Sequence, residues 1–542
     1  MAKRILPYAF LLLMLAALVP LKGRFNPDIG PRVYDGDYFY GIARHVAEGE
    51  GLATNLSLYF QGFQEFPHRV TTSPVWPLTL GGVGAATDLR KAATALPEFL
   101  YFVDLVLLYF LANALWRGIR GNQRGWLFRS GWIPNFGHVA VFVLATNVVF
   151  FRFTSVPNNE ALAFAWLFAA LLALDRAARE ASAGWALAAG LLAGVTLLTR
   201  PQLIGLAAAV PLVLAWCGLG HGKALRLGGV AAVGVLAPLV PWVVYLASWM
   251  DPLTPGAALG LETQRATPEL AVFPHVTSPP TAWAYFVDRL GGLGVAFDPD
   301  AKHAYTFHFN ALAYLVPLAL VPVCAHLLRR RPRPPRSLPA RYALATAMLA
   351  TGAVALAPVH LHHSTFALPW LFGYRHGLPL LLLILPALAY LDSHTHLAWR
   401  LAAAALLALT LVGNTLGMQT LLNKNYRSGL SGFEPDLILW LDKQSPRPSV
   451  VTTRSMALSV FSQSGYHWIL CQHAPEQTLS LLRDAGADYV VVFAKDRKCN
   501  FVRGLRPREL GVVRTFGKGA IYVLGLNDRT GDAASRRRRN GR

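Results

Sequence analysis

The chain has 542 residues, of which 54% are hydrophobic and 15% are charged, and this balance is too apolar for a soluble enzyme of this size. The formal net charge is +21, but lysine and arginine cluster between hydrophobic segments without an aromatic-basic binding module, which argues against a nucleic-acid partner. Four cysteines are too few for a disulfide framework or a cysteine-rich metal site. The composition predicts many membrane spans and one soluble domain.

Hydrophobic segments along the chain predict about eleven membrane spans. The first runs from Ile5 to about Pro20, has no convincing cleavage site, and leaves residues 21–95 as the first external loop. Within that loop, the apolar stretch Pro74–Leu80 is too short to span a bilayer and is compatible with a re-entrant segment.

Basic residues set the expected orientation, because cytoplasmic loops are enriched in lysine and arginine. Span two (Leu96–Trp116) leads to a run of arginines, and span eight ends at Arg329–Arg331, the clearest cytoplasmic marker. Span three (Pro134–Phe151) leads outward again, and a second long external loop covers residues 249–309. The pattern predicts a multi-pass protein of the inner (plasma) membrane, with a cytoplasmic amino terminus and a periplasmic or extracellular carboxyl terminus.

The region after the last span has the composition of a soluble domain. Ser449–Thr453 and Asp488–Phe493 predict buried strands, and Pro475–Ala485 predicts an amphipathic helix between them. Alternating strands and helices indicate a small α/β extracytoplasmic domain, and without a glycine-rich phosphate loop we expect it to act as a lid or to bind the acceptor. The expected boundaries are 1–420 for the transmembrane module, 432–526 for this domain and 527–542 for a disordered basic tail.

An acidic pair, Asp35 and Asp37, follows the first span in the stretch Tyr34–His45. Carboxylates beside a membrane carry a desolvation cost, so they are usually retained for a function. On an external loop, such a pair could accept a proton from a nucleophile or hold a metal ion. The alternative is that both are solvated loop residues, or an N-cap for a helix beginning near Tyr38.

Four fragments in chain order resemble the C-type glycosyltransferase (GT-C) superfamily of membrane enzymes. The first is the pattern from Asp35 to Gly51, with its Asp-x-Asp-Tyr, Ile-Ala-Arg and Gly-x-Gly elements. The others are Ser73–Pro77, Leu198–Gln202 and Tyr374–Pro379. The resemblance covers the membrane region to about residue 392 and implies a polytopic α-helical fold, in which an external domain after the last span also occurs.

The resemblance implies transfer of a sugar from a polyprenyl-phosphate donor, with Asp35 as general base on the acceptor. Inversion at the sugar needs one base on the attacking side. Asp37 would share the acceptor, or bind a divalent metal (Mg²⁺ or Mn²⁺) together with Asp35, although no cofactor is certain. Glu160 occupies the second external loop, where relatives often carry a further acidic residue. Alternatively, the Glu160 carboxylate stabilises the start of a helix through a favourable interaction with the helix dipole.

The leaving phosphate needs cations to stabilise its charge. Arg375, flanked by Tyr374 and His376 at the outer mouth of span ten, is the first candidate, since a guanidinium can grip a phosphate with two hydrogen bonds. Arg69 and Arg200 are further candidates. Arg375 could instead anchor among lipid headgroups, and Arg200 could be a structural staple of a tight hairpin.

The expected partners are the polyprenyl-phosphate sugar, the bilayer, and an external glycan, lipid or protein acceptor. The sugar stays open among mannose, arabinose and aminoarabinose. Rival functions are a membrane transporter, a non-catalytic envelope-assembly protein, and a polymerase or ligase using a diphosphate-linked donor. Cys471 and Cys499 both fall in the external domain, where an oxidising compartment would permit a disulfide.

Overall fold

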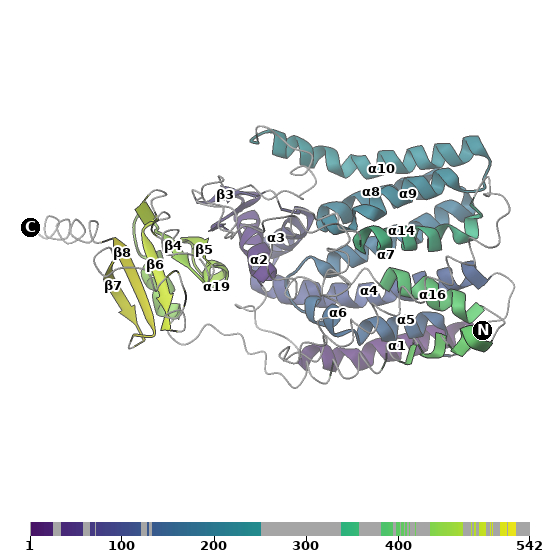
Figure 1. Ribbon diagram of the computed structural model, residues 1–542, viewed down its shortest axis with the longest axis horizontal. Coiled ribbons are helices and arrows are strands. Elements are labelled where there is room, and N and C mark those ends of the chain that lie inside the picture. The colour runs from purple at the N-terminus through teal and green to yellow at the C-terminus, as the bar shows by residue number, and fades with distance from the viewer. Residues whose placement is uncertain are drawn as a thin grey trace, which may run out of the picture. The chain divides into compact units, whose positions relative to one another are not determined.

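The described residues form two compact units. Unit 1 contains the described residues of Met1–Asn26, Ala95–Leu261 and Thr277–Asn425, and unit 2 contains those of Pro27–Thr94 and Tyr426–Arg542. The computed structural model (Figure 1) describes residues 2–24, 34–57, 66–70, 72–120, 127–128, 133–250, 338–356, 381–393, 397–400 and, with gaps, 401–526.

Unit 1 is a bundle of apolar helices that run side by side (Figure 1). Four described helices are long and apolar enough to cross a membrane, by length and composition: Ile5–Gly23, Leu89–Arg120, Glu160–Glu180 and His221–Ala247. The helices of the bundle are α1 (Ala2–Arg24), α4 (Leu89–Arg120), α5 (Phe136–Ala145), α6 (Val148–Phe153), α7 (Glu160–Glu180), α8 (Ala183–Thr199), α9 (Ile204–Trp216), α10 (His221–Ala247), α14 (Ala343–Leu356) and α16 (Leu381–Ser393).

Glycines allow α8 and α10 to pack backbone against backbone. A Cβ atom added to Gly190 would lie 2.1 Å from the Ala231 carbonyl oxygen, and one on Gly194 would lie 2.4 Å from the Val235 carbonyl oxygen. Membrane helices associate through such small residues because lipid leaves no hydrophobic driving force between helices. The four-residue spacing of Gly190 and Gly194 is thus a packing motif that the sequence analysis overlooked.

The predicted third span is divided into two helices. Helix α5 ends at Ala145, and α6 begins after Asn147, whose side chain accepts a hydrogen bond from the Phe150 backbone N–H at 3.0 Å. This N-cap satisfies an amide that a helix start leaves without a partner. The chain therefore restarts its helix at Asn147 and does not continue straight to Phe151.

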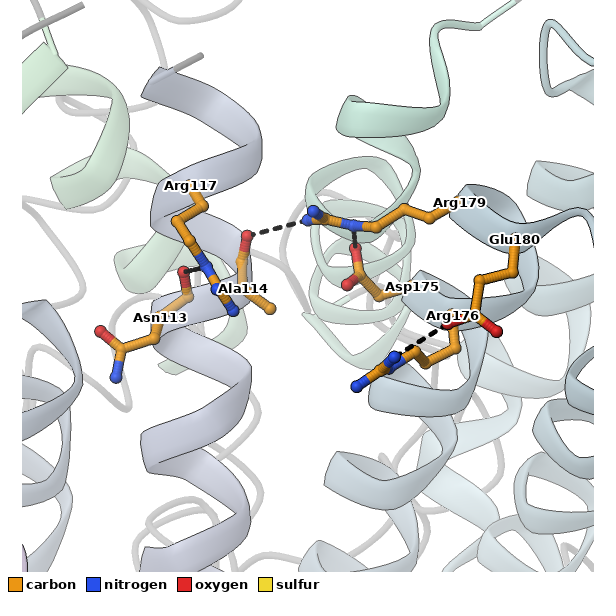
Figure 2. A network of polar contacts seen from close by, with 7 residues as sticks. All are labelled: Asn113, Ala114, Arg117, Asp175, Arg176, Arg179 and Glu180. Atoms are coloured by element: carbon orange, nitrogen blue, oxygen red, sulfur yellow. Dashed lines mark hydrogen bonds and ion pairs between the residues drawn. The ribbon is translucent and has the colours of Figure 1, made fainter. Parts of the chain in front are cut away.

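The ends of α4 and α7 meet in a network of basic residues (Figure 2). The Arg179 side chain joins the two helices, donating to Asp175 Oδ1 at 2.8 Å on its own helix and to the Ala114 carbonyl oxygen at 3.3 Å on α4. Nearby, Arg117 and Arg176 bond only to groups on their own helices in the view of Figure 2. Arginines expected on one membrane side thus gather at one end of the bundle.

Unit 2 is built on a six-stranded mixed sheet in the order β2-β5-β4-β6-β8-β7. Strands β2, β5, β4 and β6 are parallel, and β8 and β7 form an antiparallel hairpin at one edge. The strands are β2 (Leu56–Ser57), β4 (Ser449–Thr452), β5 (Gly465–Trp468), β6 (Tyr489–Phe493), β7 (Leu510–Phe516) and β8 (Ile521–Leu526).

Segments of the first loop complete this unit. Helices α2 (Tyr34–Ala47) and α3 (Val75–Ala86) pack together, α2 also packs on α19 (Ser455–Phe461), and β2 is the edge strand beside β5. A separate antiparallel pair joins β1 (Ala53–Thr54) to β3 (His68–Arg69). The loop that the sequence analysis assigns to the transmembrane module is therefore one compact unit with the carboxyl-terminal region. The stretch Pro74–Leu80 forms the N-cap and the first turns of α3, which buries Trp76 and Leu80 and leaves Leu78 exposed.

Candidate functional site

The predicted acidic pair lies at the start of α2. Ile42 and Ala43 of this helix are fully buried, and Asp37 is 3% exposed. Asp35 occupies the first turn of α2, and its side chain lies outside the described residues. Each helical residue turns about 100°, so positions 35 and 37 are about 200° apart around the helix axis. Asp37 therefore lies on the packed face of α2.

Contacts with two other segments fix α2 in place. A Cβ on Gly81 of α3 would lie 2.6 Å from Val46 Cβ and 2.7 Å from the Ala43 carbonyl oxygen, so only glycine permits this approach. Downstream of α2, the Tyr466 backbone N–H donates to the Asn55 carbonyl oxygen at 2.8 Å. The acidic helix is consequently held by the carboxyl-terminal sheet as well as by its own loop.

Two buried histidines lie beside this junction. The Phe66 ring centroid is 5.7 Å from that of His68 and 4.9 Å from that of His467. Burial, followed by the charge of the neighbouring His68, lowers the pKa of His467 to about 3. Burial, followed by the charge of His45, lowers the pKa of His68 to about 4. Both His68 and His467 are therefore neutral at pH 7.

Glu160 and Arg200 form a buried ion pair in unit 1. Arg200 Nη1 donates to Glu160 Oε1 at 2.6 Å and lies 3.3 Å from Asn159 Oδ1, and the two charged side chains are 4% and 0% exposed. The Asn159 side-chain amide donates to the Thr199 carbonyl oxygen at 2.8 Å. The structure thus brings together two predicted site residues that are far apart in the sequence.

The local sequence explains this meeting. Helix α8 ends at Thr199 because Pro201 starts the short helix η1 (Pro201–Leu203), which puts Arg200 in an extended conformation with φ −148° and ψ 97°. Glu160 is the first residue of α7, where a carboxylate is favoured by the helix dipole. Arg200 therefore links the turn after α8 to the start of α7, whereas the structural role expected from the sequence was to hold together the two helices of the hairpin on either side of it.

Two further buried charged residues of unit 1, Lys22 and Asp104, were not among the candidates expected from the sequence. Lys22 Nζ donates to the Phe151 carbonyl oxygen at 2.9 Å and to Thr154 Oγ1 at 3.0 Å, and lies 4.0 Å from the Tyr101 ring centroid. Asp104 on α4 is fully buried in the same unit. An aspartate inside a predicted span was itself the signal, since ionisable groups are rare there and usually face the bundle interior.

The remaining predicted residues divide into two groups. Arg69 is exposed on β3, opposite Ala53 of β1. Tyr374, Arg375 and His376 lie outside the described residues.

The sequence matches no protein-family model and no curated protein. Its fold, however, is similar to that of solved structures. The cryo-EM structure of the arabinofuranosyltransferase AftD from Mycobacteria matches with a TM-score of 0.52 at 15% identity, over 95% of this chain and 41% of AftD. This chain thus spans well under half of that protein.

Two further structures are similar over most of this chain. The oligosaccharyltransferase AglB from Archaeoglobus fulgidus, in complex with an inhibitory peptide and a dolichol-phosphate, gives a TM-score of 0.48 at 13% identity, over 91% of this chain and 70% of AglB. ArnT from Cupriavidus metallidurans gives a TM-score of 0.42 at 14% identity, over 95% of this chain and 98% of ArnT. All three proteins belong to the superfamily that the sequence fragments resemble.

Proposed function

We propose, from the GT-C fold that this chain shares with AftD, that it is an integral membrane glycosyltransferase. It moves a sugar from a polyprenyl-phosphate donor to an external glycan, lipid or protein acceptor, with inversion at the sugar. The observation that carries this proposal is the placement of the acidic helix α2 in a fixed unit, within a chain that matches a glycosyltransferase fold over 95% of its length.

In this proposal Asp35 is the general base. Its carboxylate takes the proton from the acceptor hydroxyl or amine while the acceptor atom bonds to the anomeric carbon and the sugar–phosphate bond breaks. The polyprenyl phosphate leaves with the bonding electrons and needs positive charge near it. Asp37, which is buried on the packed face of α2, supports the position of the helix and does not itself accept the proton.

The phosphate ligands are proposed among the predicted arginines. Arg200 already has its charge matched by Glu160, so it is a weaker candidate than Arg375 or the exposed Arg69. We assign Glu160 and Arg200 together to shaping the start of α7. Tyr374 and His376 remain proposed donor contacts because they flank Arg375 in the sequence.

An external location of unit 2 is supported by its disulfide. Cys499 is disulfide-bonded, which fits an oxidising compartment, and Cys471, the predicted partner, lies outside the described residues. In unit 1, the arginine network where α4 and α7 end (Figure 2) fits a cytoplasmic face at that end of the bundle. A free thiol, Cys217, is buried.

A metal ion at the acidic pair would need ligands in addition to the two aspartates. Asp37 is 3% exposed on the packed face of α2, so in this proposal an ion at the pair would be bound mainly through Asp35. A Mg²⁺ or Mn²⁺ ion at Asp35 would take its other ligands from the substrate phosphate or from other segments.

The test is transfer from polyprenyl-phosphate sugars by the purified chain in detergent. Asp35→Asn removes the base while keeping size and polarity, so transfer should fall by roughly two orders of magnitude or more, with donor binding kept. Asp88→Asn, at an exposed aspartate of unit 2, is the matched control and should transfer normally. Near-normal turnover by Asp35→Asn would reject the base, and equal use of a soluble nucleotide sugar would reject the lipid donor.

A further inference from the structure

The carboxyl end of α2 gathers one buried imidazole and two exposed carboxylates. The ligand atoms of His45, Glu48 and Glu50 all lie within 4.8 Å of one another. The His45 residue is 3% exposed, and its Nδ1 atom contacts Glu50 Oε2. These are three groups of the kind that bind divalent transition metals.

The local backbone builds this cluster. Gly49 has a φ of 82°, a left-handed conformation that ends the helix. The Gly49 N–H donates to the Val46 carbonyl oxygen at 3.1 Å, and the Glu50 N–H donates to the His45 carbonyl oxygen at 2.8 Å. This is the Schellman pair of hydrogen bonds, which folds the chain back over the last turn. The carboxylate of Glu50 is thereby returned to the His45 ring.

The charges at the carboxyl end of α2 favour the binding of a cation. A helix carboxyl terminus carries a partial negative charge, which disfavours nearby carboxylates and favours cations. Two glutamates lie there, and the basic residues of the last turn are Arg44 and His45, of which His45 already contacts Glu50. A bound divalent cation would relieve the repulsion among Glu48, Glu50 and the last carbonyl groups.

An independent observation comes from the neighbouring strand β3. His68 is 9% exposed, and among the described residues neither of its ring nitrogens has a hydrogen-bond partner, nor does Nε2 of His45. A buried polar atom without a partner costs about 1–3 kcal/mol, so such nitrogens are uncommon unless they have a function. Only residues 51 and 52 separate the cluster from β1, whose Thr54 pairs with His68, and the charge of His45 acts on His68. His68 thus lies near the cluster but outside the group of ligand atoms formed by His45, Glu48 and Glu50, and the buried Nε2 atom of His45 is the nitrogen that a metal ion could satisfy.

We propose that His45, Glu48 and Glu50 bind a divalent transition metal, best Zn²⁺. Imidazole nitrogen with carboxylate oxygen suits Zn²⁺, whereas Mg²⁺ requires oxygen ligands. This site goes beyond the proposed transfer reaction. Residues 35 and 45 are ten positions apart, so the ion lies about 15 Å along α2 from the general base. The role of the ion is to stabilise the carboxyl end of α2, the helix that carries the general base.

The direct test is Zn²⁺ binding to the full chain without a histidine tag, after dialysis against a chelator. We expect one saturable site by calorimetry, with affinity reduced roughly tenfold or more in His45→Ala, Glu48→Gln and Glu50→Gln. The two glutamate variants change exposed side chains, so they remain informative if His45→Ala fails to fold. His221→Ala and Glu180→Gln, at exposed residues of unit 1, are the matched controls and should bind like the wild type.

Hydrogen exchange supplies a readout separate from activity. Added Zn²⁺ should slow the exchange of amides in residues 44–50 of the wild type, and should not do so in Glu50→Gln. Absence of saturable Zn²⁺ binding, or unchanged binding by both glutamate variants, would overturn the proposal. So would a bound ion that is lost only in the Asp35→Asn variant. None of these results depends on whether the chain transfers sugar.

Discussion

Substitution of Gly465 by alanine tests the junction between the first loop and the carboxyl-terminal sheet. The new Cβ atom would lie 2.0 Å from Phe66 Cδ2 and 2.7 Å from Phe66 Cγ. Carbon atoms in contact prefer about 3.5–4.0 Å, so the ring must move. That ring also packs on His467, which limits where it can go. We expect the free energy of unfolding to fall by about 1–3 kcal/mol. Without the clash, alanine in a strand would instead raise it by roughly 0.5–1 kcal/mol relative to glycine.

The effect is best measured at the junction itself by hydrogen exchange. The Tyr466 backbone N–H, which donates to Asn55, should exchange roughly 5- to 150-fold faster in Gly465→Ala. Phe66→Ala removes the obstructing ring, so the double variant should be less destabilised than the sum of the two single changes by about 1 kcal/mol or more. Unchanged exchange at Tyr466, or strictly additive effects, would refute the proposed clash.

Three further predictions concern other parts of the chain. Gly194→Ala should lower the thermal stability of the solubilised protein because the α8–α10 approach has no room for a Cβ, whereas Gly229→Ala, with nothing within 4 Å, should not. Glu160→Gln should lower the free energy of unfolding by roughly 3–5 kcal/mol, because the buried guanidinium of Arg200 loses the carboxylate paired with it. The control Glu180→Gln changes an exposed residue and should leave the unfolding midpoint unchanged. The pKa of His467 is about 3 in the folded protein and about 6.5 in the unfolded chain, so its contribution to stability is fully present above pH 6.5 and is lost as the pH falls. In His467→Gln, the free energy of unfolding measured by urea titration between pH 6 and 4 should therefore depend less on pH, by about 1.4 kcal/mol per pH unit.

Features with a strong local signal could be predicted from the sequence. The long apolar helices follow from composition and length, and the runs around Val450 and Val491 identify buried strands, since such runs need little context. The GT-C resemblance rested on short fragments, and the fold is in fact similar to that of a GT-C member.

Features that depend on distant partners could not be predicted. Strand β2 has two residues, and nothing in Leu56–Ser57 marks it as the edge of a sheet formed at the other end of the chain. The Glu160–Arg200 pair joins residues separated by 40 positions. The one local signal was Pro201, which disfavours a helical conformation of Arg200. Pairing of this kind is decided by tertiary packing, on which single-sequence patterns carry no information.

The contact between β2 and β5 also constrains how the protein is made. Asn55 and its partner Gln463 are separated by 408 residues, so the sheet cannot be completed until nearly the whole chain has been synthesised. At ribosomal rates of about 5–20 residues per second, the first loop waits roughly 20–80 s for its partner strand. During that interval β2 has an unpaired edge, which is a template for pairing with another chain. Biogenesis of this protein therefore passes through a long-lived intermediate in which the helix that carries Asp35 and Asp37 is not yet anchored by the carboxyl-terminal sheet.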